Sequence, residues 1–254
     1  MNQFHSNSDS DKQVILVTGS SGFIGKHLIS ALKLKGDYKI LSFTRDHSMD
    51  DLKEFILRSN FIFHLASEVR PNAEKHDIAC SCNYLTKDII NILESENLFL
   101  PILFTSSIHA KIPLTEYAKS KKESEILIQN YSKKYNIECY IFQLVHIFGE
   151  SCKPNYNSVI TTWIYNTINN IDIHVVDKDQ VMIYLYVHDL ILQLIKTMKY
   201  GSKTMRVTPM LTNQTTLGEV VEYLNEFKSY ERKLIDTFDN DFKEKLYKTY
   251  SSYI

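Results

Sequence analysis

Tyr117 and Lys121 lie four residues apart in the run Glu116-Tyr-Ala-Lys-Ser-Lys121. On a helix, this spacing places the two side chains on one face, one turn apart. A lysine ammonium at that position favours the ionised phenol, so the tyrosine could exchange a proton with a carbonyl or an alcohol. The chain contains 16 tyrosines, so the spacing alone also fits chance. Whether the pair is catalytic therefore depends on the motifs around it.

A glycine-rich loop upstream of this pair has the composition of a dinucleotide-binding turn. Three of the seven glycines, Gly19, Gly22 and Gly25, fall within seven residues that follow an apolar run. Such glycines permit a tight turn, close approach of the backbone to a pyrophosphate, and close helix–strand packing. The pyrophosphate would bind the amides at the positive N-terminus of the following helix. The spacing is G-x-x-G-x-x-G rather than G-x-G-x-x-G, and a purely structural turn is the alternative.

Hydroxyl groups end the expected strand that precedes Tyr117, in the run Thr105-Ser106-Ser107. Parallel sheets bind their ligands at the carboxyl edge, where this run would lie. We assign Ser107 to orient the substrate oxygen that Tyr117 protonates, with Ser106 as the alternative because the register is open. Lys121 would hold the nicotinamide ribose. A hydride carrier combined with a tyrosine acid is the chemistry of a carbonyl reductase.

The end of the second expected strand bears on the choice of cofactor. In such sheets it lies near the adenosine ribose, where an acidic residue marks NAD and a basic one NADP. Here Phe43 is followed by Thr44-Arg45-Asp46. Arg45 could pair with a 2′-phosphate, because a guanidinium binds phosphate oxygens in a fork. Asp46 would be the NAD-type residue, and a solvated arginine is a further alternative. We expect NADPH, with NADH as the alternative.

Short β-branched and aromatic runs alternate with longer helical patterns, which is typical of a parallel sheet covered on both faces. The expected strands are Val14–Thr18, Lys39–Phe43, Asn60–Leu65, Pro101–Ser106, Glu138–Leu144 and Ile171–Val176. The expected helices are Gly25–Lys35, Asp50–Leu57, Leu85–Leu98, Thr115–Tyr135, Ser158–Asn169 and His188–Lys199. In the helix with Tyr117, we expect Ala118, Ile126, Leu127 and Tyr131 to be buried.

The alternation weakens after about residue 201, where the sequence predicts a short strand in residues 205–209 and two further helices, Leu217–Phe227 and Asp239–Tyr250. We expect one doubly wound α/β domain over residues 13–254, after a flexible polar tail of residues 1–12. Its dinucleotide-binding core would span residues 13–150. A small C-terminal substrate lobe would use residues 150–180 and 201–254.

The composition excludes several other classes of protein. With 44% hydrophobic and 23% charged residues in 254, the chain can bury a full core and has no disorder signature. A net charge of −1 gives no indication of a nucleic-acid partner, and no apolar run approaches a membrane span. The start lacks the order of a signal peptide, and the four cysteines fit no zinc spacing. We expect a cytoplasmic protein without a metal site.

Taken in order, the motifs resemble those of the extended short-chain dehydrogenase/reductases that act on nucleotide sugars, within the NAD-dependent epimerase/dehydratase family. The matching segments are Val17-Thr-Gly-Ser-Ser-Gly-Phe-Ile-Gly25, Phe63-His-Leu-Ala66, Thr105-Ser-Ser107, Tyr117-Ala-Lys-Ser-Lys121 with Glu125, Phe148-Gly149 and Tyr186-Val-His-Asp189. They span nearly the whole chain. The resemblance implies a Rossmann-type fold and a nicotinamide cofactor.

A narrower resemblance lies in Cys152-Lys-Pro-Asn-Tyr-Asn-Ser158 and in Phe238–Ser252. Both are similar to the reductase half of capsular-polysaccharide enzymes that make UDP-N-acetyl-L-fucosamine precursors. In those bifunctional enzymes, NADPH reduces the 4-keto group of a UDP-2-acetamido-2,6-dideoxy-hexulose, and a C-terminal cupin domain epimerises C3. The resemblance implies a UDP-linked 4-keto-6-deoxy amino sugar as substrate. Because the chain stops where the cupin would begin, the resemblance implies a stand-alone or truncated 4-reductase, which could have a separate cupin-type epimerase as a partner.

The resemblance also assigns site residues by their positions in the motifs. The cofactor would contact Gly19, Ser21, Gly22, Phe23, Ile24, Gly25, Leu65 and Ala66, together with Arg45, Tyr117 and Lys121. The sugar nucleotide would contact Arg70, His146, Lys153, Asn155, Tyr156 and Asn157. For the last four residues, a polar loop rich in turn formers is the alternative.

The chain departs from the family pattern at two places near the expected sugar site. Gln143 stands where the pattern has arginine, and Val145-His146 stands where it has proline-asparagine. His146 could replace the asparagine as a donor, or could mark a changed or lost substrate.

Two other functions also fit the sequence. One is a nucleotide-sugar epimerase or dehydratase that retains its cofactor, and the other is a dinucleotide-binding regulator without turnover. The resemblance also implies a homodimer that pairs through Leu85–Leu98 and Thr115–Tyr135.

Overall fold

The computed structural model describes residues 12–68, 80–229 and 238–254. Most of the expected polar tail and Arg70 lie outside the described residues. The chain divides into two compact units. Within the described ranges, unit 1 holds residues 12–68, 80–143 and 194–207, and unit 2 holds residues 144–193, 208–229 and 238–254.

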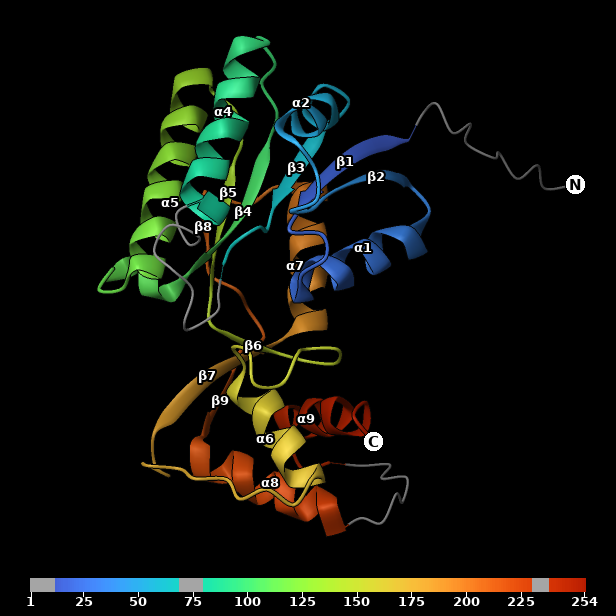
Figure 1. The fold of residues 1–254 in the computed structure, drawn as a ribbon, viewed down its shortest axis with the longest axis vertical. Helices are drawn as coiled ribbons and strands as arrows, with labels where there is room; N and C mark the ends of the chain where they lie inside the picture. Colours follow the sequence, from blue (N-terminus) through green and yellow to red (C-terminus); the bar gives the residue numbers. More distant parts are fainter. Residues whose placement is uncertain (1–11, 69–79, 230–237) are drawn as a thin grey trace, which may run out of the picture. The chain divides into compact units, whose positions relative to one another are not determined.

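Unit 1 is built on a six-stranded sheet in the order β2-β1-β3-β4-β5-β8 (Figure 1). The strands are β1 (Gln13–Thr18), β2 (Tyr38–Phe43), β3 (Phe61–His64), β4 (Ile102–Ser107), β5 (Tyr140–Leu144) and β8 (Arg206–Val207). β1 pairs in parallel with β2 and β3, β3 with β4, and β5 with β8. β3 and β4 are buried along their whole length, as expected for parallel strands covered on both faces.

Helices cover the two faces of this sheet. α2 (Met49–Leu57), α4 (Leu85–Ser95) and α5 (Glu116–Tyr135) share one core with Leu16, Ile62 and Phe104 of the strands. In Figure 1 the sheet runs between the α4–α5 pair and α1 (Phe23–Lys35). This arrangement confirms the doubly wound parallel sheet. None of the helices in the described part of the chain is long and apolar enough to cross a membrane.

The winding of the sheet reverses at β1. β2 lies on one side of β1 and β3 on the other, so the chain changes direction between β1 and β3. In open α/β sheets this reversal opens a crevice at the carboxyl ends of the strands, where ligands bind. Gly19 follows β1 and Leu65 follows β3 directly. The fold therefore places the glycine loop at the switch point.

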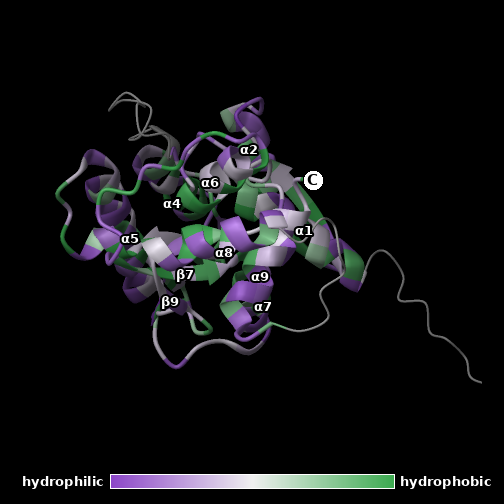
Figure 2. Ribbon diagram, turned by 90° about the horizontal axis from the view of Figure 1, so that it is seen from below, coloured by the Kyte–Doolittle hydropathy of each residue, from purple (hydrophilic) through white to green (hydrophobic). Residues whose placement is uncertain are grey.

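Unit 2 is built on a three-stranded sheet of β6 (His146–Phe148), β7 (Val181–Tyr186) and β9 (Asn213–Thr216). β7 is central, parallel to β6 and antiparallel to β9. Helices α6 (Val159–Ile168), α8 (Leu217–Ser229) and α9 (Asp241–Ser251) complete an aromatic core. Figure 2 shows hydrophobic and hydrophilic stretches along α8, whose buried residues are Val220, Leu224 and Phe227. α7 (Val187–Tyr200) has residues in both units.

Two expectations about secondary structure and burial are wrong. Ile171–Val176 forms no strand, and the strand is the next apolar run, β7, because that run finds partners in β6 and β9. Ile126 is 44% exposed, although Ala118 and Tyr131 are buried as expected. The buried face of α5 runs through positions 118, 121, 125 and 128, so position 126 lies one step off it. β6 and β9 were not predicted.

Candidate active site

The glycine loop is pressed against the end of β3. Gly19 has φ +67°, and a Cβ added there would lie 2.7 Å from the backbone nitrogen of Ala66. A Cβ on Gly25 would lie 2.3 Å from the carbonyl oxygen of Gly19. Any larger residue would force the loop away from the strand or the helix. The two glycines are therefore required by the close approach of three backbone segments.

The start of α1 offers backbone amides to an anion. Gly22 is the N-cap, and no side-chain hydrogen bond caps this end within the described residues. Ser21 and Gly22 are exposed, whereas Phe23 and Ile24 are half-buried. The turn is held to β2 by Ser20, whose Oγ donates to the carbonyl oxygen of Phe43 at 3.1 Å. Uncapped amides at a positive helix end, next to glycines that exclude side chains, fit a dinucleotide pyrophosphate.

A buried histidine ties the glycine loop to the helices behind it. His64, at the end of β3, is fully buried, with Nδ1 2.8 Å from Thr18 Oγ1 and Nε2 2.8 Å from Thr86 Oγ1. Thr86 Oγ1 donates to the carbonyl oxygen of Cys82, and Thr18 Oγ1 accepts the N–H of Ala66 at 3.3 Å. Neutral His64 with its proton on Nε2 satisfies all four bonds.

The charge state of His64 agrees with this chain of hydrogen bonds. Burial and then the positive charge of Lys121 lower the pKa of His64 from 6.5 to about 3. A second ring proton would also break the bond that Thr18 donates to Nδ1. His64 is therefore a neutral structural residue. The family resemblance includes the motif that contains His64, but it did not predict this hydrogen-bond network.

Arg45 lies two residues after the end of β2, and its guanidinium is paired with an acid. Its Nη2 lies 2.7 Å from Oε2 of Glu68, whose side chain is fully buried, while the Arg45 side chain is 71% exposed. The ion pair fixes the guanidinium near the carboxyl edge of the sheet without burying it. The neighbouring Asp46 is exposed and lies 3.5 Å from Thr44 Oγ1.

Tyr117 and Lys121 both lie in the first two turns of α5. Thr115 is the N-cap, and its side chain accepts the N–H of Ala118, so the helix begins directly before Tyr117. The Nζ of Lys121 lies 5.9 Å from the centroid of the half-buried Tyr117 ring. Lys121 is 2% exposed and donates to the carbonyl oxygen of Thr105 at 2.6 Å. This bond fastens the helix to the end of β4.

The two candidate serines at the end of β4 have different partners. Ser106 Oγ donates to Oε1 of Glu125 at 2.6 Å. Ser107 Oγ instead accepts the backbone N–H of His109 at 3.2 Å, which leaves its own hydrogen to donate. Because neighbouring residues of a strand face opposite sides, these two hydroxyls point apart. Ser107 can therefore still donate a hydrogen bond, whereas the hydrogen of Ser106 is used by Glu125.

The Ser106 hydroxyl donates to a buried carboxylate, that of Glu125. The sequence motifs include Glu125 but do not predict a role for it. Glu125 is fully buried, and its Oε1 also accepts from Gln143 Nε2 at 3.1 Å. Its Oε2 lies 3.4 Å from Nη2 of Arg206 and 3.8 Å from Nζ of Lys122. Arg206 was missed altogether, because an isolated arginine in a short strand carries no local signal.

The expected sugar-site residues that the structure describes lie in unit 2. His146 is exposed on β6, and its ring centroid lies 6.0 Å from that of Tyr184. Lys153 Nζ lies 5.9 Å from the centroid of the Tyr156 ring. The loop is folded onto α6, since the N–H of Asn155 donates to Thr162 Oγ1 at 3.0 Å. Lys153, Asn155 and Asn157 are exposed.

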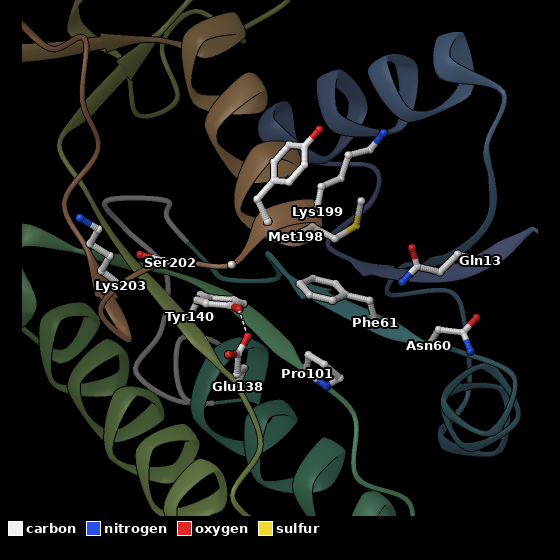
Figure 3. A pocket seen from close by; sticks show the side chains of 12 residues that line it. Gln13, Asn60, Phe61, Pro101, Glu138, Tyr140, Met198, Lys199, Ser202 and Lys203 are labelled. Carbon is white, nitrogen blue, oxygen red and sulfur yellow. Dashed lines mark hydrogen bonds between the residues drawn. The ribbon is translucent and has the colours of Figure 1, made fainter.

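A shallow hollow of about 610 Å³ opens at the opposite edge of the sheet in unit 1 (Figure 3). Residues just before or at the starts of four strands line it, among them Gln13, Phe61, Pro101 and Glu138. Glu138 accepts from Tyr140 OH at 2.5 Å inside it. Because α/β sheets bind their ligands at the carboxyl ends of strands, this hollow is not the dinucleotide site.

A doubly wound sheet with a glycine loop at its switch point and a Tyr–Lys pair on an adjoining helix defines a dinucleotide-binding α/β protein. Residues 15–205 match the model of the NAD dependent epimerase/dehydratase family. The chain belongs to this family, whose cofactor is a nicotinamide dinucleotide.

The similar proteins include reductases of sugar nucleotides. The chain is 31% identical, over 94% of its length, to UDP-2-acetamido-2,6-beta-L-arabino-hexul-4-ose reductase of Pseudomonas aeruginosa. It is 32% identical, with a TM-score of 0.82 over 94% of its length, to the capsular polysaccharide assembling protein CapF of Staphylococcus aureus. It spans 64% and 65% of these two proteins. A UDP-glucose 4-epimerase of Thermotoga maritima shares the fold at 17% identity and a TM-score of 0.79.

Proposed function

We propose that this protein is an NADPH-dependent reductase of the 4-keto group of a UDP-linked 2-acetamido-2,6-dideoxy-hexulose. The observation that carries the proposal is the group at the end of β4, where buried Lys121 lies beside the Tyr117 ring and donates to the strand that presents Ser107. The similarity to a reductase of P. aeruginosa that is named for such a sugar supports the choice of substrate.

Three residues, Tyr117, Ser107 and Lys121, share the catalytic roles in this reaction. The glycine loop, Tyr117 and Lys121 would hold the nicotinamide cofactor, which would supply a hydride to C4 of the sugar. Tyr117 donates its phenolic proton to the carbonyl oxygen that becomes an alcohol. Ser107 donates a hydrogen bond to the same oxygen and holds it against Tyr117. Lys121 brings a positive charge beside Tyr117 and stabilises the phenolate that remains after the transfer.

The preference for NADPH depends on Arg45. Its guanidinium is largely exposed, and with one nitrogen held by Glu68, its other donors can bind a 2′-phosphate. Arg45→Ala should weaken NADPH binding about tenfold while leaving NADH binding unchanged, because only NADPH carries the phosphate. Fluorescence titration of both cofactors measures the ratio. An equal loss for both cofactors would remove the basis of the preference.

We assign the sugar nucleotide to polar residues of unit 2 and, by its position in the motifs, to Arg70. Lys153 supplies a positive charge for the diphosphate, and Tyr156 beside it supplies an aromatic face. Asn155, Asn157 and His146 supply hydrogen-bonding groups for the UDP-sugar, as their positions in the motifs imply.

The experiment that tests the reaction measures cofactor oxidation by the purified protein with a UDP-4-keto-6-deoxy amino sugar. A reductase oxidises one NADPH for each sugar reduced. A cofactor-retaining epimerase or dehydratase gives no net oxidation, and a regulator gives binding without turnover. Tyr117→Phe should lower kcat by about 10²- to 10⁴-fold, since it removes only the proton donor. Tyr135→Phe, on the same helix, is the matched control and should keep full activity. Equal activity of the two variants would refute the role of Tyr117.

A further inference from the structure

Glu125 carries a negative charge with no access to water. Its side chain is fully buried on α5, one turn beyond Lys121. Isolating a carboxylate from water is costly unless hydrogen bonds and an opposite charge replace the solvent. The groups around Glu125 therefore determine whether this part of α5 can stay in place.

The two oxygens of Glu125 receive different kinds of partner. Oε1 accepts from two neutral donors, Ser106 Oγ at 2.6 Å and Gln143 Nε2 at 3.1 Å. Oε2 faces the cations, with Arg206 Nη2 at 3.4 Å and Lys122 Nζ at 3.8 Å. The neutral donors satisfy the lone pairs, but only the cations compensate the charge. Arg206 is the nearer of the two.

Arg206 reaches Glu125 from the edge of the sheet. It lies on β8, where it is paired with Ile141 of β5, two residues before Gln143. When the Gln129 amide is turned so that its oxygen faces the guanidinium, that oxygen accepts from Arg206 Nη2 at 2.7 Å. The guanidinium is therefore held between two residues of α5, although its side chain is 47% exposed.

The carboxylate of Glu125 also holds the end of β4 through a hydrogen bond. Two side-chain bonds connect α5 to this strand end, Lys121 to the carbonyl oxygen of Thr105 and Ser106 to Glu125. These bonds hold the two residues directly before Ser107. Fixing them sets where the Ser107 hydroxyl points relative to the first turn of α5, which carries Tyr117.

We propose that Arg206 is a positioning residue of the reductase, which neutralises buried Glu125 and thereby keeps Ser107 in register with Tyr117. The proposal rests on the proposed function for its effect on rate, but its structural part can be tested without turnover. Arg206 itself touches neither the reacting atoms nor the cofactor in this scheme.

The test compares Arg206→Gln with Arg206→Lys, and with Gln143→Arg introduced into the Arg206→Gln chain. Arg206→Gln should lower kcat about tenfold or more, since a small misplacement at the reacting centre is costly. The Kd of NADPH should stay unchanged because the glycine loop is intact. The lysine variant and the Gln143→Arg variant should each recover most of kcat, because each returns a cation beside Glu125. Arg58→Gln, which removes an exposed pair with Glu54 on α2, is the matched control and should change nothing.

Hydrogen exchange of the amides at the end of β4 gives the readout that does not need activity. Arg206→Gln should exchange faster than wild type at residues 105–108, with recovery in both restored variants. Unchanged exchange there, or a kcat equal to that of Arg58→Gln, would overturn the proposal. If the wild type shows no reductase activity, the proposed function fails, and the exchange data alone then decide whether Arg206 positions the strand end.

Discussion

The neutral, buried state of His64 makes the stability of this protein depend on pH in a defined way. In the folded chain its pKa is lowered to about 3, whereas in the unfolded chain it returns to the ordinary 6.5. Between these values the unfolded chain binds a proton that the folded chain does not. Acid therefore favours unfolding in this pH window. The contribution of neutral His64 to the free energy of unfolding is present in full only above pH 6.5.

The size of the effect follows from the width of the window. Each pH unit below 6.5 lowers the free energy of unfolding by about 1.36 kcal/mol. At about pH 5 the contribution of His64 is therefore a loss of about 2 kcal/mol relative to about pH 7.5. Carboxylates also titrate toward this range, so the quantity to compare is the difference between wild type and His64→Gln. Glutamine retains a donor and an acceptor but gains no proton.

The assay is urea unfolding of both proteins at the two pH values. His64→Gln should be less stable than wild type at about pH 7.5, because its amide cannot reach both Thr18 and Thr86 as the ring does. Its further loss on acidification should be about 2 kcal/mol smaller than that of wild type. His109→Gln, at an exposed position, is the control and should follow wild type. Equal losses in wild type and His64→Gln would refute a neutral His64.

Two further predictions concern the glycine loop and the thiols. Gly19→Ala should abolish NADPH binding in a titration, since its Cβ would lie 2.7 Å from Ala66 N, whereas Gly36→Ala, with φ +73° but open space around it, should cost stability only and retain binding. Cys139 should react with a thiol reagent only when the chain unfolds, because it is 2% exposed and burial raises the pKa of its thiol to about 11. Rapid labelling of Cys139 in the native protein, or NADPH binding by Gly19→Ala, would contradict these expectations.

Local patterns predicted most of the parallel sheet. The apolar runs that became β1 to β5 are short, and each is followed by turn or helix signals. The prediction of a strand at Ile171–Val176 failed because β-propensity does not specify a partner strand. Strand pairing is decided by contacts between residues distant in sequence. β6 and β9 were missed for the same reason. Each is only three or four residues long and is defined by its pairing with β7.

The candidate site shows the same division between local and distant information. Tyr117, Lys121 and the glycines are visible as spacings, because one helix or one loop contains them. Arg206 and Glu125 are 81 residues apart, and nothing near either one indicates the other. The His64 network likewise joins three separate elements, β1, β3 and α4. Contacts of this kind become visible only once the sheet order is known.

The glutamine at position 143, where the family pattern has arginine, is explained by the contacts around Glu125. From the sequence, the loss of an arginine beside a family motif raised the alternative of a regulator with a decayed site. In the structure, Gln143 still donates to Glu125, and Arg206 of the adjoining strand contacts the other oxygen of the same carboxylate. Removing either partner of such a pair would leave an uncompensated charge in the interior, which is strongly destabilising. Gln143 is therefore accommodated in this fold by Arg206, and its presence does not by itself indicate a decayed site.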